Sequence, residues 1–224
     1  MKLYMHPAST TSRAVALFIA DGKLPVDLQV VDIFQGEHMK PPFASINPNK
    51  MVPVLEDGDF RMTESSAILK YLAEKSGSPA YPRDLKQRAR INEVMDWINS
   101  NLYRDWGYGL IYPQVFPSHK RPSEETQKNT IAWGKERAEA WLKILNDNII
   151  GPRNKFLCGD EISVADYFGA AIIQVGDLIR CNLSKYPNIT RWLNNMKSRP
   201  GWAKTYEVIN GFAESLKGQQ FVAV

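Results

Sequence analysis

Cysteine is scarce in this sequence of 224 residues, which contains only Cys158 and Cys181. The two form no Cys-x-x-Cys motif and have no metal-binding spacing to the three histidines. This pattern argues against a disulfide framework and indicates no metal site. We therefore expect two reduced thiols in a cytoplasmic protein.

Long hydrophobic runs and clusters of one charge are also missing. The N-terminal residues MKLYMHPAS contain no apolar core of signal-peptide length. The best apolar stretch, FGAAIIQVGDLI, is interrupted by Gln174 and Asp177 and is shorter than the ~20 residues that span a bilayer. The 28 basic and 24 acidic residues are interspersed, so no basic patch suggests binding to nucleic acid. We expect neither a membrane nor a nucleic acid as a partner.

The composition that remains, 44% hydrophobic and 23% charged, is typical of a globular protein. Residues 1–77 alternate short strands with helices, which predicts a small α/β domain. The expected elements are a strand at Lys2–Met5, a helix at Ser9–Gly22, a strand at Val26–Val31, a hairpin in MVPVLEDGDFRM and a helix at Thr63–Ser76. Because a helix joins the first two strands, we expect them to be parallel.

The segment GSPAYPRD breaks this pattern with two prolines and a glycine, and we interpret residues 78–87 as a linker. Over residues 88–224 apolar side chains recur every three or four positions, which predicts an all-helical second domain. Within it, Ser163 and Asp166 have the spacing of a capping box, with Asp in place of the usual Glu. This combination of an α/β domain and an all-α domain does not by itself define a function.

Two motifs would form a peptide-binding site if the first domain has thioredoxin-like topology. If the bond between Val52 and Pro53 is cis, the Val52 backbone is free to pair with an extended peptide, although an ordinary trans proline is the alternative. The residues Thr63-Glu64-Ser65-Ser66 open a helix, whose N-terminus can bind a carboxylate while Glu64 holds an ammonium group. Plain capping by Thr63 is the alternative there.

A third motif, HPASTTSRAV, places four hydroxyl side chains where a strand ends and a helix begins. One of them must cap the helix, which leaves others free to face a ligand. If the ligand atom is a thiol, a donated hydrogen bond favours the nucleophilic thiolate. Residue spacing alone leaves Ser9, Thr10, Thr11 and Ser12 as competing donors.

The whole chain resembles the cytosolic glutathione transferases, with its closest similarity to the theta and delta classes and their bacterial relatives. The resemblance is carried by HPASTTSRAV, GEHMKPPFASINPNKMVPVL, TESSAILKYL and ISVADYF, in the family's order. It implies a thioredoxin-like N-terminal domain that binds glutathione and an all-α domain that shapes the site of the electrophile. It also implies a homodimer and no metal.

The resemblance also implies residue roles. Ser9, four residues before Arg13, matches the catalytic serine that hydrogen-bonds the glutathione sulfur. The matching glutathione-binding positions are His38, Lys50, Val52, Pro53 (cis), Glu64 and Ser65. Ser66 departs from the arginine that many delta-like members carry, which puts one extra carboxylate contact in doubt. Ser163 and Asp166 match a capping motif that the family uses for folding.

The aromatic stretch LYRDWGYGLIYPQVF supplies the candidates for an apolar electrophile pocket. These are Tyr103, Trp106, Tyr112 and Phe116, each of which could equally belong to the core or a dimer contact. Tyr108 is a further candidate as a polar contact to a leaving group.

The resulting hypothesis is a glutathione transferase that conjugates the glutathione thiolate to small apolar electrophiles. A glutathione-dependent peroxidase or dehalogenase of the same fold is the first alternative, and a non-catalytic glutathione-binding scaffold is the second. A thioredoxin-like disulfide oxidoreductase conflicts with the absence of any cysteine before Cys158.

Overall fold

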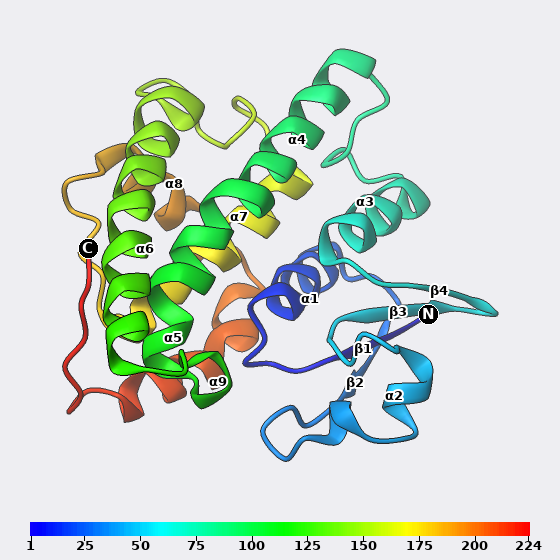
Figure 1. Cartoon of the computed structure of the whole chain (residues 1–224). Helices are drawn as coiled ribbons and strands as arrows, with labels where there is room; N and C mark the ends of the chain where they lie inside the picture. Colours follow the sequence, from blue (N-terminus) through cyan, green and yellow to red (C-terminus); the bar gives the residue numbers. More distant parts are fainter.

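A four-stranded sheet organises the N-terminal part of the chain in the computed structural model, which describes residues 1–224 (Figure 1). The strands are β1 (Lys2–Met5), β2 (Asp27–Val30), β3 (Val54–Asp57) and β4 (Phe60–Met62), in the spatial order β2-β1-β3-β4. β1 pairs with β2 in parallel, while β3 is antiparallel to both β1 and β4. The predicted parallel pair and the hairpin with its turn at Gly58 are thereby confirmed.

Strand β2 confirms the strand predicted at Val26–Val31. All four of its residues are exposed, with Leu28 at 44% and Val30 at 49%. The reason is position, because β2 lies at the edge of the sheet and pairs only with β1.

Helices cover both faces of the sheet (Figure 1). Helices α1 (Thr10–Gly22) and α3 (Ser65–Ser76) lie on one face, and the short α2 (Phe43–Ile46) lies on the other. Leu3 and Leu55 point toward α1 and α3 and have no exposed surface. Val31, Phe43 and Val54 form a small separate cluster beneath α2.

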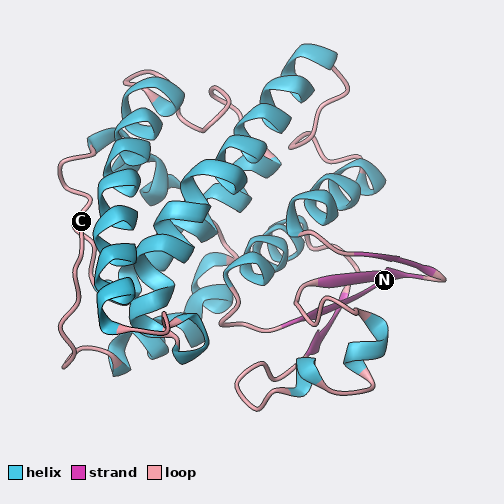
Figure 2. Ribbon diagram, viewed as in Figure 1, coloured by secondary structure: helices cyan, strands magenta, loops and turns pink.

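The rest of the chain is helical, and strands are confined to the first domain (Figure 2). Its helices are α4 (Leu85–Trp97), α5 (Tyr112–Val115), α6 (Glu124–Ile144), α7 (Val164–Gln174), α8 (Pro187–Lys197) and α9 (Trp202–Ser215). Helix α4 begins within the predicted linker, because Asp84 caps it by accepting a hydrogen bond from the Gln87 amide at 2.9 Å. No helix combines the length and apolar character that crossing a membrane requires.

The chain between α4 and α5 stays helical but takes wider, π-type turns over Ile98–Leu102 and Arg104–Ile111. This segment crosses α6 at a point without side chains. A Cβ atom on Gly134 would lie 2.4 Å from the carbonyl carbon of Gly109, so only glycine permits this approach. The glycine pair brings the aromatic segment close against α6.

The two domains share one hydrophobic core, since α1 packs against α7 and α9 of the helical domain. Asp21 of α1 fixes this contact. Its carboxylate accepts hydrogen bonds from Arg199 Nε at 2.7 Å, the Gly201 amide at 3.0 Å and the Tyr167 hydroxyl at 3.2 Å. These hydrogen bonds therefore hold the C-terminal end of α1 against the helical domain.

Candidate active site

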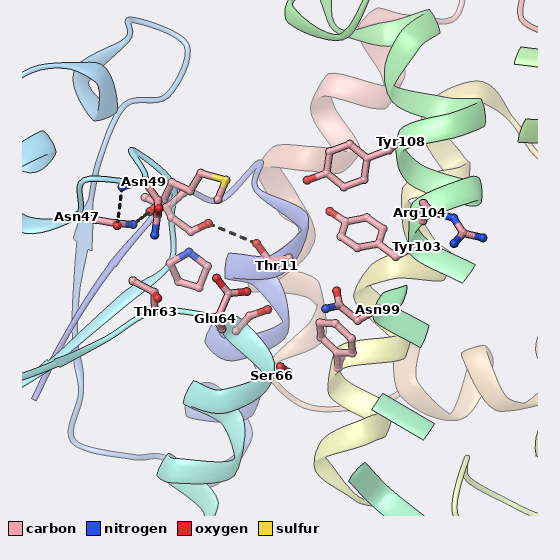
Figure 3. A pocket seen from close by; sticks show the side chains of 15 residues that line it. Thr11, Asn47, Asn49, Thr63, Glu64, Ser66, Asn99, Tyr103, Arg104 and Tyr108 are labelled. Carbon is pink, nitrogen blue, oxygen red and sulfur yellow. Dashed lines mark hydrogen bonds between the residues drawn. The ribbon is translucent and has the colours of Figure 1, made fainter. Parts of the chain in front are cut away.

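A cavity of about 320 Å³ opens between the two domains (Figure 3). The α/β domain contributes Thr11, Asn47, Asn49, Met51, Val52, Pro53, Thr63, Glu64, Ser65 and Ser66. The helical domain contributes Asn99, Tyr103, Arg104, Tyr108 and Phe168. Four of the predicted glutathione-binding residues (Val52, Pro53, Glu64 and Ser65) are thus brought to one cavity, together with one predicted electrophile residue, Tyr103.

The turn before β3 presents the Val52 backbone to the cavity. Buried Asn47 shapes it, since its side-chain amide donates to the Met51 carbonyl at 2.8 Å and its oxygen accepts from the Asn49 amide at 3.0 Å. The peptide bond between Val52 and Pro53 is cis. A backbone edge at this position, whose carbonyl makes only a long contact with the Thr11 hydroxyl, suits pairing with an extended peptide.

The N-terminus of α3 forms the second part of the cavity. Glu64 occupies the capping position with φ 63° and ψ 105°, and no side chain caps the helix. Capping by Thr63, the plain alternative, is therefore not what the structure has. The first-turn amides, from Ser65 onward, remain able to bind a carboxylate. The Glu64 side chain is directed into the cavity, where it can pair with an ammonium group (Figure 3).

The four hydroxyls at the start of α1 have different surroundings. Ser9 caps the helix through a long contact, with its Oγ 3.4 Å from the Ser12 amide and 3.4 Å from Thr11 Oγ1. Thr11 lines the cavity, and its hydroxyl donates to the Val52 carbonyl at 3.4 Å. Ser12 is fully buried and its Oγ has no hydrogen-bond partner. Ser9 and Thr11 are therefore the two hydroxyls that remain half exposed. Ser9 is not among the residues that line the cavity and reaches it only through its contact with Thr11, so its catalytic role stays a prediction.

Thr10 instead joins the two domains. Its hydroxyl lies 2.8 Å from the Tyr112 hydroxyl, which lies 2.7 Å from the Tyr103 hydroxyl. All three side chains are buried. Burial raises the pKa of Tyr112 to about 12 and raises that of Tyr103 well above its ordinary value, so both phenols stay neutral at pH 7.

The side of the cavity formed by the helical domain carries several polar side chains and is not the apolar pocket that the sequence predicts. In Figure 3 the Tyr103 and Tyr108 side chains extend toward the α/β domain, whereas the Arg104 guanidinium points away from it. Arg104 pairs instead with the Asp105 carboxylate, with both N–O distances at 3.0 Å. Burial raises the pKa of Tyr108, which leaves its hydroxyl a neutral hydrogen-bond donor.

Trp106 does not line this cavity, and its proposed place in the electrophile pocket has to be corrected. Its side chain has no exposed surface, its indole donates to the Ile172 carbonyl at 2.9 Å, and its ring abuts Gly176. Helical spacing brings a residue to an inward face without telling whether that face meets a cavity or the core.

The other two predicted electrophile residues lie beyond the lining of the cavity. Tyr112 is buried, with its hydroxyl engaged by Thr10 and Tyr103. Phe116 is half buried and stacks on Phe212 of α9, with ring centres 5.9 Å apart.

Two predicted contacts to the glycyl end of glutathione, His38 and Lys50, lie outside the lining of the cavity as well. His38 is half buried in a short turn, Glu37–Met39, and its Nδ1 has no partner. Lys50 is exposed with φ 55° and stands between two lining residues, Asn49 and Met51. Each therefore stays a prediction as a ligand contact.

Several lining residues were not singled out from the sequence. Asn47 and Asn49 lie in the segment INPNK, whose Asn-Pro pair signals a turn but not its contact with a ligand. Asn99 carried no signal, because a single polar residue on a helix usually faces solvent.

A thioredoxin-like domain and an all-helical domain that share such a cavity define the glutathione S-transferase fold. The family model of the glutathione S-transferase N-terminal domain matches residues 3–80, and that of the C-terminal domain matches residues 110–200. Human glutathione S-transferase theta-1 is 33% identical over 218 residues, covering 93% of this chain and 88% of the relative. The chain belongs to the glutathione S-transferase family and is homologous to its theta class.

Solved structures agree with this assignment. The apo form of human glutathione S-transferase T1-1 aligns with a TM-score of 0.79 and 30% identity, covering 97% of this chain and 96% of that chain. Human glutathione transferase theta-2, in complex with glutathione and an unknown ligand, aligns with a TM-score of 0.84 and 25% identity, covering 99% of this chain and 92% of that chain. The protein is thus an enzyme of the glutathione S-transferase type.

Proposed function

We propose that this enzyme binds glutathione in the cavity between its domains and conjugates the glutathione thiolate to small electrophiles. The observation that carries the proposal is the convergence of Val52, the open N-terminus of α3 and the Thr11 hydroxyl of α1 on one cavity, with the Ser9 hydroxyl directly next to Thr11. Glutathione has the matching groups: a peptide backbone, an α-carboxylate with an ammonium group, and a thiol. Its binding to the theta-2 structure supports the same role here.

The binding mode follows from these groups. The cysteinyl part of glutathione pairs with the Val52 backbone, and the γ-glutamyl carboxylate accepts from the amides at the start of α3. The γ-glutamyl ammonium pairs with Glu64. Lys50, exposed beside the cavity and without an ion-pair partner, attracts the glycyl carboxylate, and His38 approaches the same end.

Ser9 holds the thiolate in this proposal. Lowering the thiol pKa by ~2 units takes about 2.7 kcal/mol, and one charge-assisted hydrogen bond supplies ~1.5–3 kcal/mol. The Ser9 hydroxyl suits this task because its contact with Thr11 Oγ1, at 3.4 Å, is weak enough to be exchanged for the sulfur, while its oxygen can go on accepting from the Ser12 amide. The N-terminus of α1 adds a favourable field.

The thiolate then attacks a carbon atom of the electrophile, forms the carbon–sulfur bond and expels a leaving group or adds to a double bond. The electrophile packs beside Tyr103, with Tyr108 able to donate a hydrogen bond to a leaving group. Beyond the cavity, Phe116 and its partner Phe212 offer apolar surface to larger substrates. Rate enhancement comes from proximity and from a larger thiolate fraction.

We further propose a cytoplasmic homodimer with a glutathione-binding domain over residues 1–77, a linker over 78–87 and a helical domain over 88–224. The family resemblance supports the dimer, and so does the exposed Trp133 on α6, 60% accessible in the single chain.

Retention on immobilised glutathione, followed by ultraviolet difference absorption of the bound thiolate, tests the proposal. We expect the wild type and Ser9→Ala to be retained, and only the wild type to show thiolate at neutral pH. Thr11→Ala is the matched control, because it removes the neighbouring hydroxyl of the same turn. Retention without any thiolate in the wild type would favour a binding protein over a transferase.

A further inference from the structure

The residue directly before Ser9 has both of its backbone polar groups fixed by side chains. The Ala8 amide donates to His6 Nδ1 at 3.1 Å, and the Ala8 carbonyl accepts from Arg13 Nη1 at 2.7 Å. The Ser9 amide in turn donates to the His6 carbonyl at 2.9 Å. His6 therefore contacts the turn that leads to the proposed catalytic serine through its ring and its backbone.

The hydrogen bond from Ala8 determines the state of the His6 ring. A ring nitrogen that accepts an amide proton cannot carry a proton itself, so His6 is neutral, with its proton on Nε2. The environment agrees: the ring is 7% exposed and packs edge to face on Phe34 at 5.1 Å. Burial lowers the pKa of His6, while Asp32 opposes and His38 reinforces this effect.

The Arg13 side of the turn is anchored from the other domain. Arg13 is completely buried, donates from Nη2 to Gln174 Oε1 of α7 at 3.3 Å, and lies over the Tyr206 ring at 5.2 Å. The Ala8 carbonyl is thus held through the helical domain, and the Ala8 amide is held within the α/β domain by His6. The Ala8 amide belongs to the peptide group between Pro7 and Ala8, so losing the second contact would let that group rotate and would shift the turn that leads to Ser9, while the Ala8 carbonyl stays on Arg13.

We propose that His6 is a positioning residue for the transfer reaction, which sets the direction of the Ser9 hydroxyl by accepting the Ala8 amide proton. This inference rests on the proposed role of Ser9. Its chemical requirement is an acceptor two residues before the amide, the geometry that an asparagine or aspartate side chain provides in an Asx turn. Aromaticity and charge at position 6 are not required.

A pair of variants separates the acceptor from simple packing. His6→Leu removes the acceptor and keeps apolar bulk against Phe34, whereas His6→Asn keeps a side-chain oxygen that can accept the Ala8 amide. We expect His6→Leu to lower kcat by about 10-fold with KM for glutathione within about threefold of wild type, because orientation rather than binding is lost. The thiolate absorption should fall in parallel, and His6→Asn should restore both.

Unchanged kcat in His6→Leu would overturn the proposal, as would equal losses in the Asn and Leu variants. Ser9→Ala is measured alongside. If Ser9→Ala keeps the thiolate absorption, the proposed role of Ser9 fails. If Ser9→Ala loses the thiolate absorption and His6→Leu keeps it, only the positioning role of His6 fails. Should His6→Leu not fold, nitrogen-15 NMR of the wild-type histidine ring decides. A proton on Nε2 with an unprotonated, hydrogen-bonded Nδ1 supports the proposal, and a proton on Nδ1 overturns it.

Discussion

The N-termini of α1 and α7 both carry a serine at the capping position, in very different surroundings. At α7, Asp166 is completely buried and accepts from the Leu157 amide, the Ser163 amide and the Trp192 indole, each at 2.8 Å, and from Ser163 Oγ at 2.9 Å. At α1, Ser9 has only two contacts, both at 3.4 Å, and stays half exposed. A saturated cap stabilises the fold, while an unsaturated one beside a cavity has hydrogen-bonding capacity left for a ligand.

Removing Asp166 should produce the largest effect. Asp166→Ala leaves three N–H donors without their partner in the interior, which should lower the free energy of unfolding by about 3–5 kcal/mol. Urea denaturation measures this loss. Asp84→Ala is the matched control at the exposed cap of α4, where we expect about 1 kcal/mol. Equal losses of unfolding free energy in the two variants would show that the buried hydrogen bonds of Asp166 contribute no more to stability than an exposed helix cap.

Substitution of Ser9 should mainly lower activity, whereas substitution of Ser163 should mainly lower stability. Ser9→Ala should lower kcat by about 100-fold, equivalent to ~2.7 kcal/mol, with less than about 1 kcal/mol lost in stability. Ser163→Ala should lose about 1–2 kcal/mol of stability and keep kcat where the protein is folded. Steady-state kinetics and urea denaturation of both variants measure the comparison. Similar behaviour of the two serines would remove the distinction between a stabilising cap and a catalytic one.

The hydroxyl chain from Thr10 to Tyr103 should contribute less. Tyr112→Phe removes its central hydroxyl and should cost about 1–2 kcal/mol, because two buried hydroxyls lose a partner. Tyr108→Phe, with 44% of its side chain exposed, should cost less than about 0.5 kcal/mol. Thermal unfolding compares the two phenylalanine variants, and a larger loss in Tyr108→Phe would contradict this ranking.

Acid sensitivity of stability should be the smallest effect. Burial lowers the pKa of His6, so below the ordinary pKa of about 6.5 the unfolded chain binds a proton that the folded chain resists. Stability should therefore fall as the pH drops from about 7.5 through this value and level off below the folded pKa. His119, whose pKa burial also lowers, acts in the same direction.

Urea denaturation at several pH values should show a flatter slope in His6→Asn than in the wild type, and His119→Asn serves as the comparison. A wild-type slope of opposite sign, or one that both substitutions leave unchanged, would contradict the assignment.

Sequence patterns predicted the elements well where local chemistry determines them. The helix after Ser9, the Asp-Gly hairpin and the Ser163–Asp166 cap need only residues a few positions apart. The alternation that predicted β2 does not show that this strand lies at an edge of the sheet with its residues exposed. Trp106 was misplaced for a similar reason, since its partners Ile172 and Gly176 are distant in the chain.

The site was predictable in its outline and less so in its details. Val52, Pro53, Glu64 and Ser65 came from motifs that carry their own chemistry. The different roles of the four adjacent hydroxyls depend on partners that are distant in the sequence. Thr10 contacts Tyr112, Thr11 contacts the Val52 carbonyl, and no local sequence pattern indicates either contact. The same holds for Asn99, which reaches the cavity only because the turns after α4 face the α/β domain.

A crystal structure of the enzyme grown with glutathione tests the central claim most directly. We predict that the sulfur replaces Thr11 Oγ1 as the partner to which the Ser9 hydroxyl donates, within hydrogen-bonding distance, with the cysteinyl backbone paired to Val52. A sulfur that contacts Thr11 instead, or that meets no hydroxyl of this turn, would contradict the account.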